Sequence, residues 1–292
     1  MLRTHHRYPY TPFTAPVGWT WPGGRKLAIY VALNLEVYGF GEGLSEQLVP
    51  GGPEPDVLNF AWRDYGNRVG AWRLLEAFRA IGIPVTLLVN AEIYDSCPGL
   101  VEAYRAAGAC DAAHGRTNAE SQAGLDEAAE RKLIADATRV IAGQEGKPPA
   151  GWLGPWIAET IRTPDLLREA GYRYVLDWCM DDRPVWLTTT AGPLLALPYP
   201  QELNDSNMIV ARRASVGEFT GAVIDQLEEM LAQDGPPVVL GVALHAYIAG
   251  QPYRLRRLRA AFERLAAARD RAWLTTADAI ASHVWTQGMP PR

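Results

Sequence analysis

The sequence predicts a single α/β domain built as a β/α barrel. Short apolar runs alternate with longer segments of helical period, which is typical of β/α units around a mainly parallel sheet. The length of 292 residues suits such a fold, because β/α barrels of roughly 250 residues form single domains. Polar residues directly follow several of the runs, as expected where functional groups gather at the carboxyl ends of parallel strands.

Seven or eight strands are expected, each a short apolar run between turn residues. In chain order these runs are Leu27–Leu33, Val85–Val89, Cys110–Ala113, a short run near Trp152, Tyr174–Leu176, Leu194–Leu197, Val238–Leu244 and Ala272–Thr275. The segments between them predict helices at Arg68–Ala80, Pro98–Ala107, Asp126–Ala142, Thr163–Ala170, Val216–Ala232 and Tyr253–Ala268. A terminal helix is expected to carry His283.

Local signals support the ends of several helices. Thr163 precedes Pro164, so its hydroxyl is expected to cap a helix that has proline at its first position. Gly82, Gly108 and Gly171 are expected to close helices before the next strand.

The chain is expected to divide into an extended N-terminal arm, residues 1–26, and one barrel domain, residues 27–292. The arm carries prolines and no periodic pattern: Pro9, Pro12, Pro16 and Pro22. It either lies on the barrel and contacts a second subunit or is an unstructured terminus. The first alternative predicts a homo-oligomer.

Composition excludes several classes of protein. Hydrophobic residues make up 48% of the chain and charged residues 21%, which supports a large core. The net charge is only −5 with mixed signs, so no nucleic-acid partner is expected. The sequence offers no signal-peptide pattern and no apolar run of about 18 residues that would span a bilayer, so we expect a cytoplasmic protein without a membrane partner. Three scattered cysteines predict reduced thiols rather than a redox pair or zinc cluster.

Three polar residues at strand ends indicate hydrolytic chemistry. His245 ends the run Val242–Leu244, His114 follows Cys110–Ala113, and Glu36 ends the run that begins at Val31. A lone histidine in such a place is more often structural, but two of only five histidines lie at strand ends. We therefore interpret all three residues as candidates for an active site.

Further candidates follow other strands. The segment Asp177–Trp186 places three acids, Asp177, Asp181 and Asp182, beside Trp178 and Trp186, where partial desolvation would raise a carboxyl pKa; a capped turn paired with Arg183 is the structural alternative. Trp152 and Trp156 flank a Gly-Pro turn and form either a pocket wall or part of the core. Tyr199 and Asn204 lie in a polar cluster that either contacts a polar substrate or forms an ordinary turn.

Nucleotide chemistry is not expected. The chain has no Gly-x-x-x-x-Gly-Lys phosphate loop, no Gly-x-Gly-x-x-Gly after the first strand and no Gly-x-Ser-x-Gly elbow. The glycine-rich segment Gly39–Gly43 lacks the spacing of a dinucleotide fingerprint.

Taken in order, these strand-end residues resemble the five motifs of the polysaccharide deacetylase superfamily, the NodB-homology fold, over roughly residues 27–285. That resemblance implies an irregular barrel of seven or eight β/α units and a role in carbohydrate metabolism. The first motif falls on Asn34 and Glu36, and the second, His-x-x-x-His, on His114 and Asn118. The remaining motifs match Gly151–Trp156, Asp177-Trp178 with Asp181, and Leu244-His245.

The departures from the metal-binding pattern resemble those of cofactor-independent allantoinases, which have Leu-Asn-x-Glu in the first motif. The pattern His-x-x-x-x-Gly-x-Pro-x-Arg is also shared, at His245, Gly250, Pro252 and Arg254. The resemblance implies no resident metal, since the Asn118 amide is a poor substitute for imidazole; if zinc or another divalent ion binds, Glu36 and His114 would hold it. Val37-Tyr38 and residues 62–68 differ and suggest a sister group with its own substrate.

The leading hypothesis is hydrolysis of a carbon–nitrogen bond in a small cyclic amide, imide or ureide, with Glu36 as general base and His245 as general acid. His114 and Arg116 would hold the carbonyl oxygen, with Asp181 as a further catalytic residue. The substrate would be bound by Asn34, Arg116, Asn118, Trp152, Trp156, Trp178, Asp182, Tyr199 and Asn204. A metal-dependent N-deacetylase is the second hypothesis, and an inactive barrel that binds a small molecule is the third.

Overall fold

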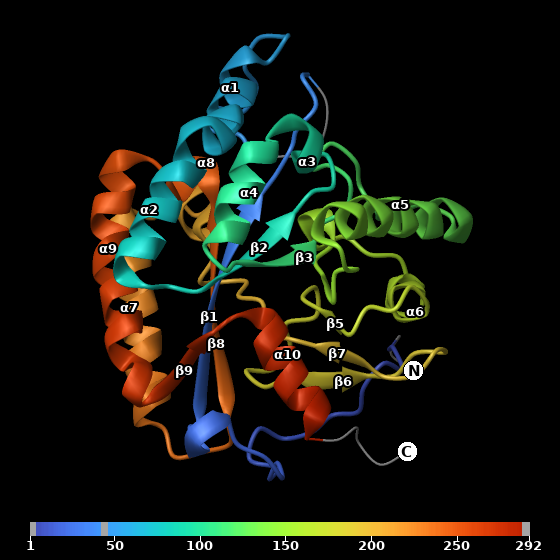
Figure 1. Cartoon of the computed structure of the whole chain (residues 1–292), viewed down its shortest axis with the longest axis vertical. Coiled ribbons are helices and arrows are strands. Elements are labelled where there is room, and N and C mark those ends of the chain that lie inside the picture. The colour runs from blue at the N-terminus through green and yellow to red at the C-terminus, as the bar shows by residue number, and fades with distance from the viewer. Residues whose placement is uncertain (1–3, 42–45, 288–292) are drawn as a thin grey trace.

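The computed structural model describes residues 4–41 and 46–287 and contains one curled sheet of nine strands. The sheet order is β6-β7-β5-β4-β3-β2-β1-β8, with β9 also paired to β1 (Figure 1). The strands are β1 (Leu27–Leu35), β2 (Val85–Val89), β3 (Cys110–Ala113), β4 (Gly151–Trp152), β5 (Tyr174–Val175), β6 (Val185–Leu187), β7 (Leu194–Ala196), β8 (Val238–His245) and β9 (Ala272–Thr275). Every predicted strand is present, within two residues at each end.

Strand β1 pairs with three other strands. It pairs with β8 along one edge, and its other edge pairs first with β9 and then with β2. The free edge of β8 meets loops rather than a strand: Val239 N–H donates to the Asp182 carbonyl at 2.8 Å and Ala243 N–H to the Leu203 carbonyl at 3.0 Å. The predicted irregular barrel is therefore confirmed. Beside β8 it is closed by single hydrogen bonds to loops rather than by a strand.

Strand β6 was not predicted and is antiparallel to β7. Its three residues follow the acidic and aromatic segment 177–184, so the run is too short to show a period of its own. The sheet is mainly parallel, as predicted, with one antiparallel pair at this hairpin.

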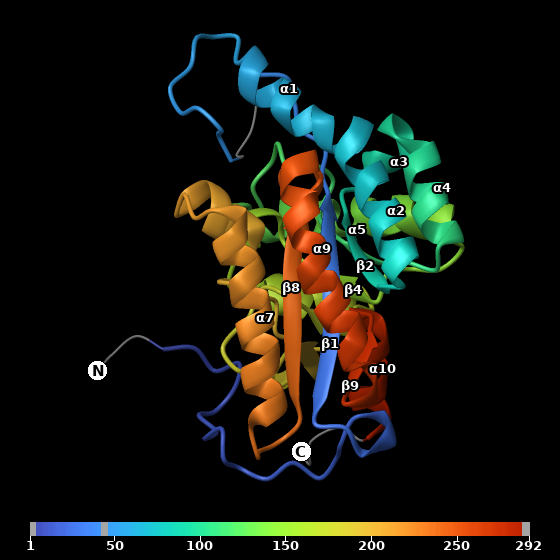
Figure 2. The same cartoon turned by 90° about the vertical axis from the view of Figure 1, so that its left-hand side faces the viewer.

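The helices pack outside the sheet, and Figure 2 shows α7 and α9 lying along β8 and β1. The longer helices are α1 (Val57–Tyr65), α2 (Ala71–Ile81), α4 (Pro98–Ala106), α5 (Glu127–Glu145), α6 (Thr163–Glu169), α7 (Val216–Ala232), α9 (Pro252–Ala267) and α10 (Ala277–Thr286). Short helices α3 (Ile93–Ser96) and α8 (Ala246–Ala249) and the π-helical turns η2 (Gly66–Gly70) and η4 (Ser206–Ala211) lie near the carboxyl ends of the strands. The sequence predicted neither α1 nor the π-helical turns.

The predicted ends of four helices can be compared with the structure. Gly82, Gly108 and Gly171 have φ of 80°, 81° and 95°, so the left-handed ends predicted at glycine are confirmed. Thr163 is not a cap, because the helix begins at this residue and its hydroxyl accepts from Thr160 N–H at 2.9 Å.

Alternation along β1 sorts its side chains between two apolar layers. Ile29, Val31 and Leu33 face the helices, whereas Tyr30 and Ala32 belong to the cluster inside the barrel. Because the period of a strand is two residues, the inner face continues at Asn34 and, just past the strand end, at residue 36.

The described part of the N-terminal arm, residues 4–26, crosses the barrel beside the β6–β7 hairpin. Thr188 N–H donates to the Arg7 carbonyl at 2.6 Å, and Arg7 forms an ion pair with Asp165 at 2.9 Å. Arg183, predicted to pair within its own turn, pairs with Asp181 at 2.8 Å and also donates to the Phe13 carbonyl at 3.0 Å. The arm is therefore fastened to the barrel at several points.

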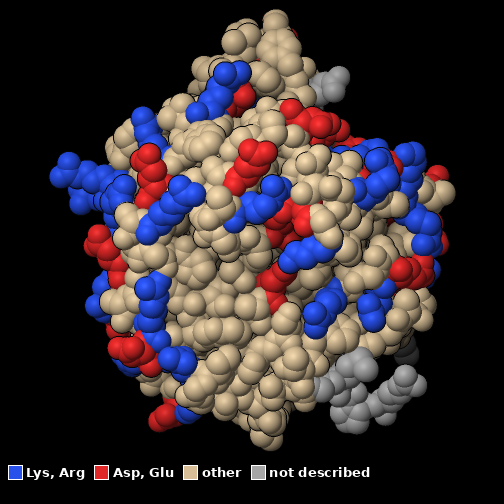
Figure 3. Space-filling view, viewed as in Figure 1, with Lys and Arg blue, Asp and Glu red and all other residues tan. Residues whose placement is uncertain are grey.

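The surface carries mixed charge on the face shown in Figure 3, where acidic and basic side chains lie beside one another. The ion pairs of the described chain include Arg116–Glu120 and Arg131–Glu127. No helix within residues 4–41 and 46–287 is long and apolar enough to cross a membrane.

Candidate functional site

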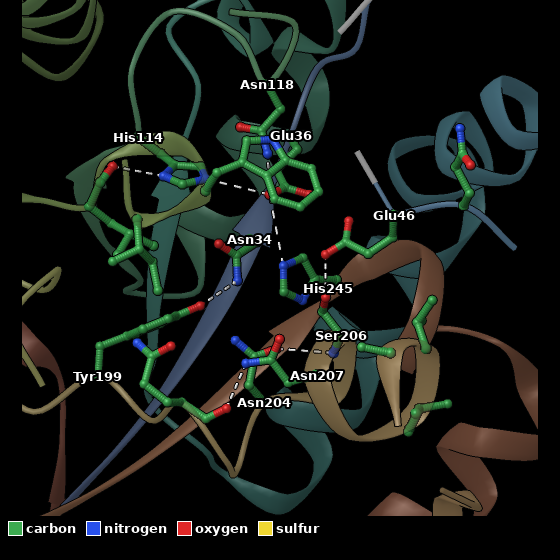
Figure 4. A pocket seen from close by; sticks show the side chains of 18 of the residues that line it. Asn34, Glu36, Glu46, His114, Asn118, Tyr199, Asn204, Ser206, Asn207 and His245 are labelled. Carbon is green, nitrogen blue, oxygen red and sulfur yellow. Dashed lines mark hydrogen bonds and ion pairs between the residues drawn. The ribbon is translucent and has the colours of Figure 1, made fainter. Parts of the chain in front are cut away.

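Three strand ends bring Glu36, His114 and His245 together at the mouth of the barrel (Figure 4). Oε1 of Glu36 lies 3.4 Å from Nε2 of His114 and 3.8 Å from Nε2 of His245. All three side chains are at least nine-tenths buried. The parallel pairing of β1 with β8, and of β2 with both β1 and β3, sets this geometry.

These residues line a cavity of about 820 Å³. Its wall also includes apolar side chains such as Leu153 and Ile209, with amide groups from Gln201 and Asn207. The sequence-predicted residues that line it are Asn34, Glu36, His114, Asn118, Trp156, Tyr199, Asn204 and His245. A cavity that combines apolar side chains with many polar groups suits a polar small molecule.

Glu36 is held as a carboxylate by its neighbours. The Asn118 amide donates to Oε1 at 2.7 Å, and the Tyr38 hydroxyl donates to Oε2. Burial alone would raise the pKa of Glu36, but the charge of His245 and hydrogen bonds from His114 and Tyr38 outweigh burial and lower that pKa. The Glu36 carboxylate is therefore ionised at neutral pH, as a general base must be.

His245 is oriented by Asp205, a fully buried residue. Nδ1 of His245 lies 2.7 Å from Oδ1 of Asp205, and the His245 backbone N–H donates to the same carboxylate at 2.9 Å. Burial would lower the pKa of His245, but the charges of Glu36 and Asp205 raise it to about 10. At neutral pH His245 thus carries a proton on Nε2, which faces Glu36 and the cavity.

His114 has a fixed ring orientation. Its Nδ1 lies 2.8 Å from the Leu153 carbonyl, which can only accept, so Nδ1 carries a hydrogen and Nε2 is directed at Glu36. The strand end thus presents one ring nitrogen to the cavity and anchors the other in the barrel wall.

The orientation of the Asn118 amide follows from a chain of hydrogen bonds. Asn90 accepts from Val37 N–H at 2.8 Å through its oxygen and donates to the His114 carbonyl through its nitrogen. The same nitrogen donates to Oδ1 of Asn118 at 3.1 Å, which leaves the Asn118 NH₂ facing Glu36. A flipped amide would set oxygen against the carboxylate.

The Asn118 amide directs its NH₂ group, which cannot bind zinc, at Glu36. In this arrangement the second motif supplies one metal-binding side chain, His114. Among residues 4–41 and 46–287, no three His, Cys, Asp or Glu side chains are grouped as metal ligands.

Asn34, Tyr199 and Asn204 complete the floor of the cavity. The Asn34 amide donates to the Tyr199 hydroxyl at 3.2 Å and to the Leu244 carbonyl at 3.1 Å. Asn204 accepts from Ser206 N–H at 3.0 Å, which shapes the turn that presents Asp205 to His245. Asn34 and Asn204 therefore hold neighbouring segments together through hydrogen bonds and also line the cavity.

Five of the predicted residues do not line this cavity. Trp152 is fully buried and packs edge-on against Tyr172 at 5.5 Å. Arg116, expected at the carbonyl oxygen, instead pairs with Glu120 at 2.5 Å. Asp181 is engaged by Arg183, and the others outside the cavity are Asp182 and Trp178.

A carboxyl pair lies behind the wall that carries Trp156. Asp177 accepts from Gly154 N–H at 2.8 Å, and Glu159 accepts from the Trp178 indole at 2.8 Å. Burial and the neighbouring Asp177 charge raise the pKa of Glu159 to about 10, and burial raises that of Asp177 to about 6. The sequence predicted perturbed acids at Asp177, Asp181 and Asp182, and the pKa is raised at Asp177 and Asp182. Glu159 is a partner that the sequence did not single out.

The loop residue Glu46 was missed by sequence reasoning and lines the cavity. It accepts hydrogen bonds from the Ser206 hydroxyl and, at 2.5 Å, from Tyr247. The Tyr247 and Tyr38 hydroxyls are 3.3 Å apart, so two tyrosines connect Glu46 to Glu36. No periodic pattern marks Glu46, whereas Asp205 followed Asn204 in a polar cluster that the sequence did single out. The glycine-rich segment Gly39–Gly43 lies partly outside the described residues.

Comparisons with known proteins agree with this architecture. The chain is 27% identical to Puue allantoinase, with a TM-score of 0.82 over 98% of this chain and 99% of that one. The crystal structure of a "probable Polysaccharide deacetylase" from Pseudomonas aeruginosa PAO1 is 27% identical, with a TM-score of 0.79 over 93% and 95% of the two chains. A Schizosaccharomyces pombe protein named "Putative polysaccharide deacetylase" is 24% identical over 301 residues, covering 92% of this chain and 93% of its own length. No protein-family model matches the chain.

These similarities confirm the predicted resemblance to the polysaccharide deacetylase superfamily and its allantoinase-like branch. The similar proteins are named as an allantoinase and as polysaccharide deacetylases.

Proposed function

We propose that this relative of the polysaccharide deacetylases and allantoinases opens a small cyclic amide, imide or ureide by general acid–base hydrolysis without a resident metal. The observation that carries the proposal is the pairing of opposite protonation states: an ionised Glu36 faces a protonated His245 across 3.8 Å in the wall of the cavity. An ionised Glu36 can take a proton from the attacking water, and a protonated His245 can give a proton to the leaving nitrogen.

In the proposed reaction, Glu36 takes a proton from water as its oxygen bonds to the carbonyl carbon. The carbonyl oxygen gains negative charge, and His114 stabilises it by donating a hydrogen bond from Nε2, a role that requires a proton on Nε2 in addition to the one on Nδ1. The carbon–nitrogen bond then breaks, and His245 transfers its proton to the leaving nitrogen. The products are a carboxylic acid and an amine or urea nitrogen on one opened chain. Proton exchange with water restores Glu36 and His245.

Asp205 and Asn118 prepare the two catalytic groups. Asp205 accepts from Nδ1 of His245, so the transferable proton is on the nitrogen that faces the substrate. Asn118 holds Oε1 of Glu36 at 2.7 Å, which fixes the direction of the carboxylate. Arg116 is left out of the mechanism because it is paired with Glu120.

The polar lining supports an amide-like substrate. Asn34, Asn204 and Asn207 present donors and acceptors of the kind that a ureide or imide offers in return. The structural neighbour with the TM-score of 0.82 is an allantoinase, and a cyclic ureide is the corresponding substrate class.

The test compares Glu36→Gln and His245→Ala with the parent chain on allantoin, hydantoin, cyclic imides and acetylated amines. We expect ring opening by the parent and a loss of turnover on the order of a hundredfold or more in each variant. Near-normal turnover in both variants would refute the assignment. Metal content is measured on the same protein, purified without chelator.

A metal-dependent N-deacetylase is the alternative that this experiment distinguishes. It predicts a near-stoichiometric divalent ion, release of acetate from acetylated amines and loss of activity on chelation. Tight ligand binding without turnover on any substrate would instead support an inactive binding barrel.

A further inference from the structure

Three residues in the cavity wall have strained backbone conformations. Within residues 4–41 and 46–287, the only non-glycine residues with positive φ are Trp156 (63°), Ile157 (53°) and Arg213 (57°). All three line the cavity of Glu36 and His245. Left-handed conformations are uncommon for such side chains and gather at ligand-binding positions, where the surrounding structure holds them.

Arg213 is held in this conformation by the turn that follows η4. Arg212 N–H donates to the Asn207 carbonyl at 2.9 Å, and Ala214 N–H donates to the Met208 carbonyl at 2.8 Å. The chain therefore reverses at residue 213, and the π-helical turn and Arg213 together form one side of the cavity. π-Helical turns of this kind frequently occur at functional sites.

The Arg213 guanidinium has no acidic partner among the described residues, in contrast to its neighbour. Arg212, which does not line the cavity, pairs with Glu202 at 3.3 Å. The cavity also contains Arg254, whose guanidinium donates to the Ile248 carbonyl at 3.3 Å. Two guanidinium groups thus line the cavity without an ion pair to any described carboxylate.

The two carboxylates of the cavity are already engaged. Glu36 accepts from Tyr38 and Asn118, and Glu46 accepts from Ser206 and Tyr247. Neither forms a salt bridge with Arg213 or Arg254 within the described chain. The cavity therefore offers unpaired positive charge to a ligand, beside groups that recognise an amide.

We propose that Arg213 binds a carboxylate of the substrate, so that the substrate is a small cyclic amide or ureide that carries an acid group. Arginine suits this role because its planar guanidinium binds a carboxylate through two parallel hydrogen bonds. The inference rests on the proposed function for the ring, but the anion site itself is tested by binding alone.

The probes are hydantoin-5-acetic acid and its uncharged amide, which share the ring and differ in one charge. Their dissociation constants are measured by calorimetry on the Glu36→Gln variant, which prevents turnover. We expect the acid to bind at least tenfold more tightly than the amide, with the preference lost in Glu36→Gln/Arg213→Gln and largely kept in Glu36→Gln/Arg213→Lys. The matched control, Glu36→Gln/Arg212→Gln, should keep the full preference.

Absence of a preference for the acid, or its persistence without Arg213, would overturn the proposal. Ring opening by the parent chain tests the proposed function separately, since it depends on Glu36 and His245 in substrates with or without an acid group. A negative result in the binding test therefore does not affect the test of ring opening, and the reverse is also true.

A further variant separates recognition from structure. Arg213→Gly removes the guanidinium and suits the left-handed backbone, so it should lose the acid preference while its midpoint of thermal unfolding is unchanged or higher. A lower midpoint would show that Arg213 is retained for folding and would contradict the proposal.

Discussion

Glu36 shows how one side chain's function depends on its immediate partners. Its pKa is lowered despite full burial because His245, His114 and Tyr38 together favour the charged form. Of these partners, the Tyr38 hydroxyl has no role in the proposed proton transfers. It therefore offers a way to shift the pKa of Glu36 without removing a catalytic group.

We predict that Tyr38→Phe moves the acidic limb of the pH–rate profile to higher pH. Removing the hydrogen bond to Oε2 destabilises the carboxylate and so raises the pKa of Glu36, and the general base must be ionised to act. The profile of kcat/KM against pH measures the shift. Tyr253→Phe, at an exposed tyrosine outside the cavity, serves as control, and an unmoved limb in Tyr38→Phe would show that this hydrogen bond does not tune Glu36.

The sequence predicts the residues of the site that follow strands, and it does so for a physical reason. Glu36, His114 and His245 each end an apolar run, and parallel pairing of the runs brings their ends to one edge. Asp205 and Glu46 lie on loops whose paths no periodicity determines, so their contacts with His245 and Tyr247 appear only in three dimensions. Arg116 was misplaced because the sequence does not reveal that Glu120 and Asp136 engage it.

At the scale of elements, η2 positions the segment that follows His245. Gly66 and Gly70 allow this helical turn to pack directly on α8: a Cβ built on Gly70 would lie 2.1 Å from the Ala246 carbonyl oxygen. The sequence predicted a helix from Arg68 and missed the π-helical turn, because its bulged geometry is set by this contact and has no signature in residue spacing.

We predict that Gly70→Ala destabilises the fold by about 1–3 kcal/mol, the usual cost of overpacking a buried contact. It should also reduce turnover, since Ala246 adjoins His245. Gly99→Ala is the matched control, because a Cβ at Gly99 meets nothing within 4 Å and alanine favours a helix. Equal unfolding free energies for the two variants in urea titrations would refute the close-packing argument.

The carboxyl pair of Glu159 and Asp177 links the loop after β4 to the end of β5. The folded-state pKa of Glu159, about 10, lies above its ordinary value of 4.5, so the folded chain keeps a proton that the unfolded chain loses. The free energy of unfolding must then fall, for this group, as pH rises from 4.5 towards 10.

We predict that Glu159→Gln becomes more stable relative to the parent chain as pH increases through that range. The glutamine amide can donate towards Asp177 and accept from Trp178, as the protonated acid does, but it does not titrate. Chemical unfolding at pH 5, 7 and 9 measures the difference, with Glu102→Gln on exposed α4 as control. A difference that is constant with pH would mean that Glu159 is ionised in the folded state.

At the scale of the whole molecule, the barrel is an incomplete circle fastened by segments from outside the sheet. The strand pattern predicted seven or eight strands in a mainly parallel sheet, but not the β6 hairpin or the loop contacts along β8. Those features depend on contacts between segments that are far apart in the sequence. The N-terminal arm is the longest segment of this kind. Its Arg7 joins the arm to α6 through Asp165, whose pKa falls to about 2 mainly because of the hydrogen bond from Arg7.

We predict that Arg7→Ala lowers the free energy of unfolding at pH 7 by about 1–3 kcal/mol, because it leaves a buried carboxylate short of a partner. The loss stays moderate since Arg162, at 3.1 Å, and Thr190 N–H, at 2.8 Å, still contact Asp165. Arg139→Ala is the control: Arg139 is 72% exposed beside Asp136, and such pairs contribute less than about 1 kcal/mol.

The effect of Arg7→Ala should also depend on pH. Because the folded pKa of Asp165 lies below its ordinary value of 3.8, the stability that the Asp165 carboxylate contributes is present above pH 3.8 and is lost as pH falls through about 2. The gap between parent and Arg7→Ala should therefore narrow in acid, whereas a gap that is independent of pH would mean that Arg7 acts by packing and backbone contacts rather than by its charge.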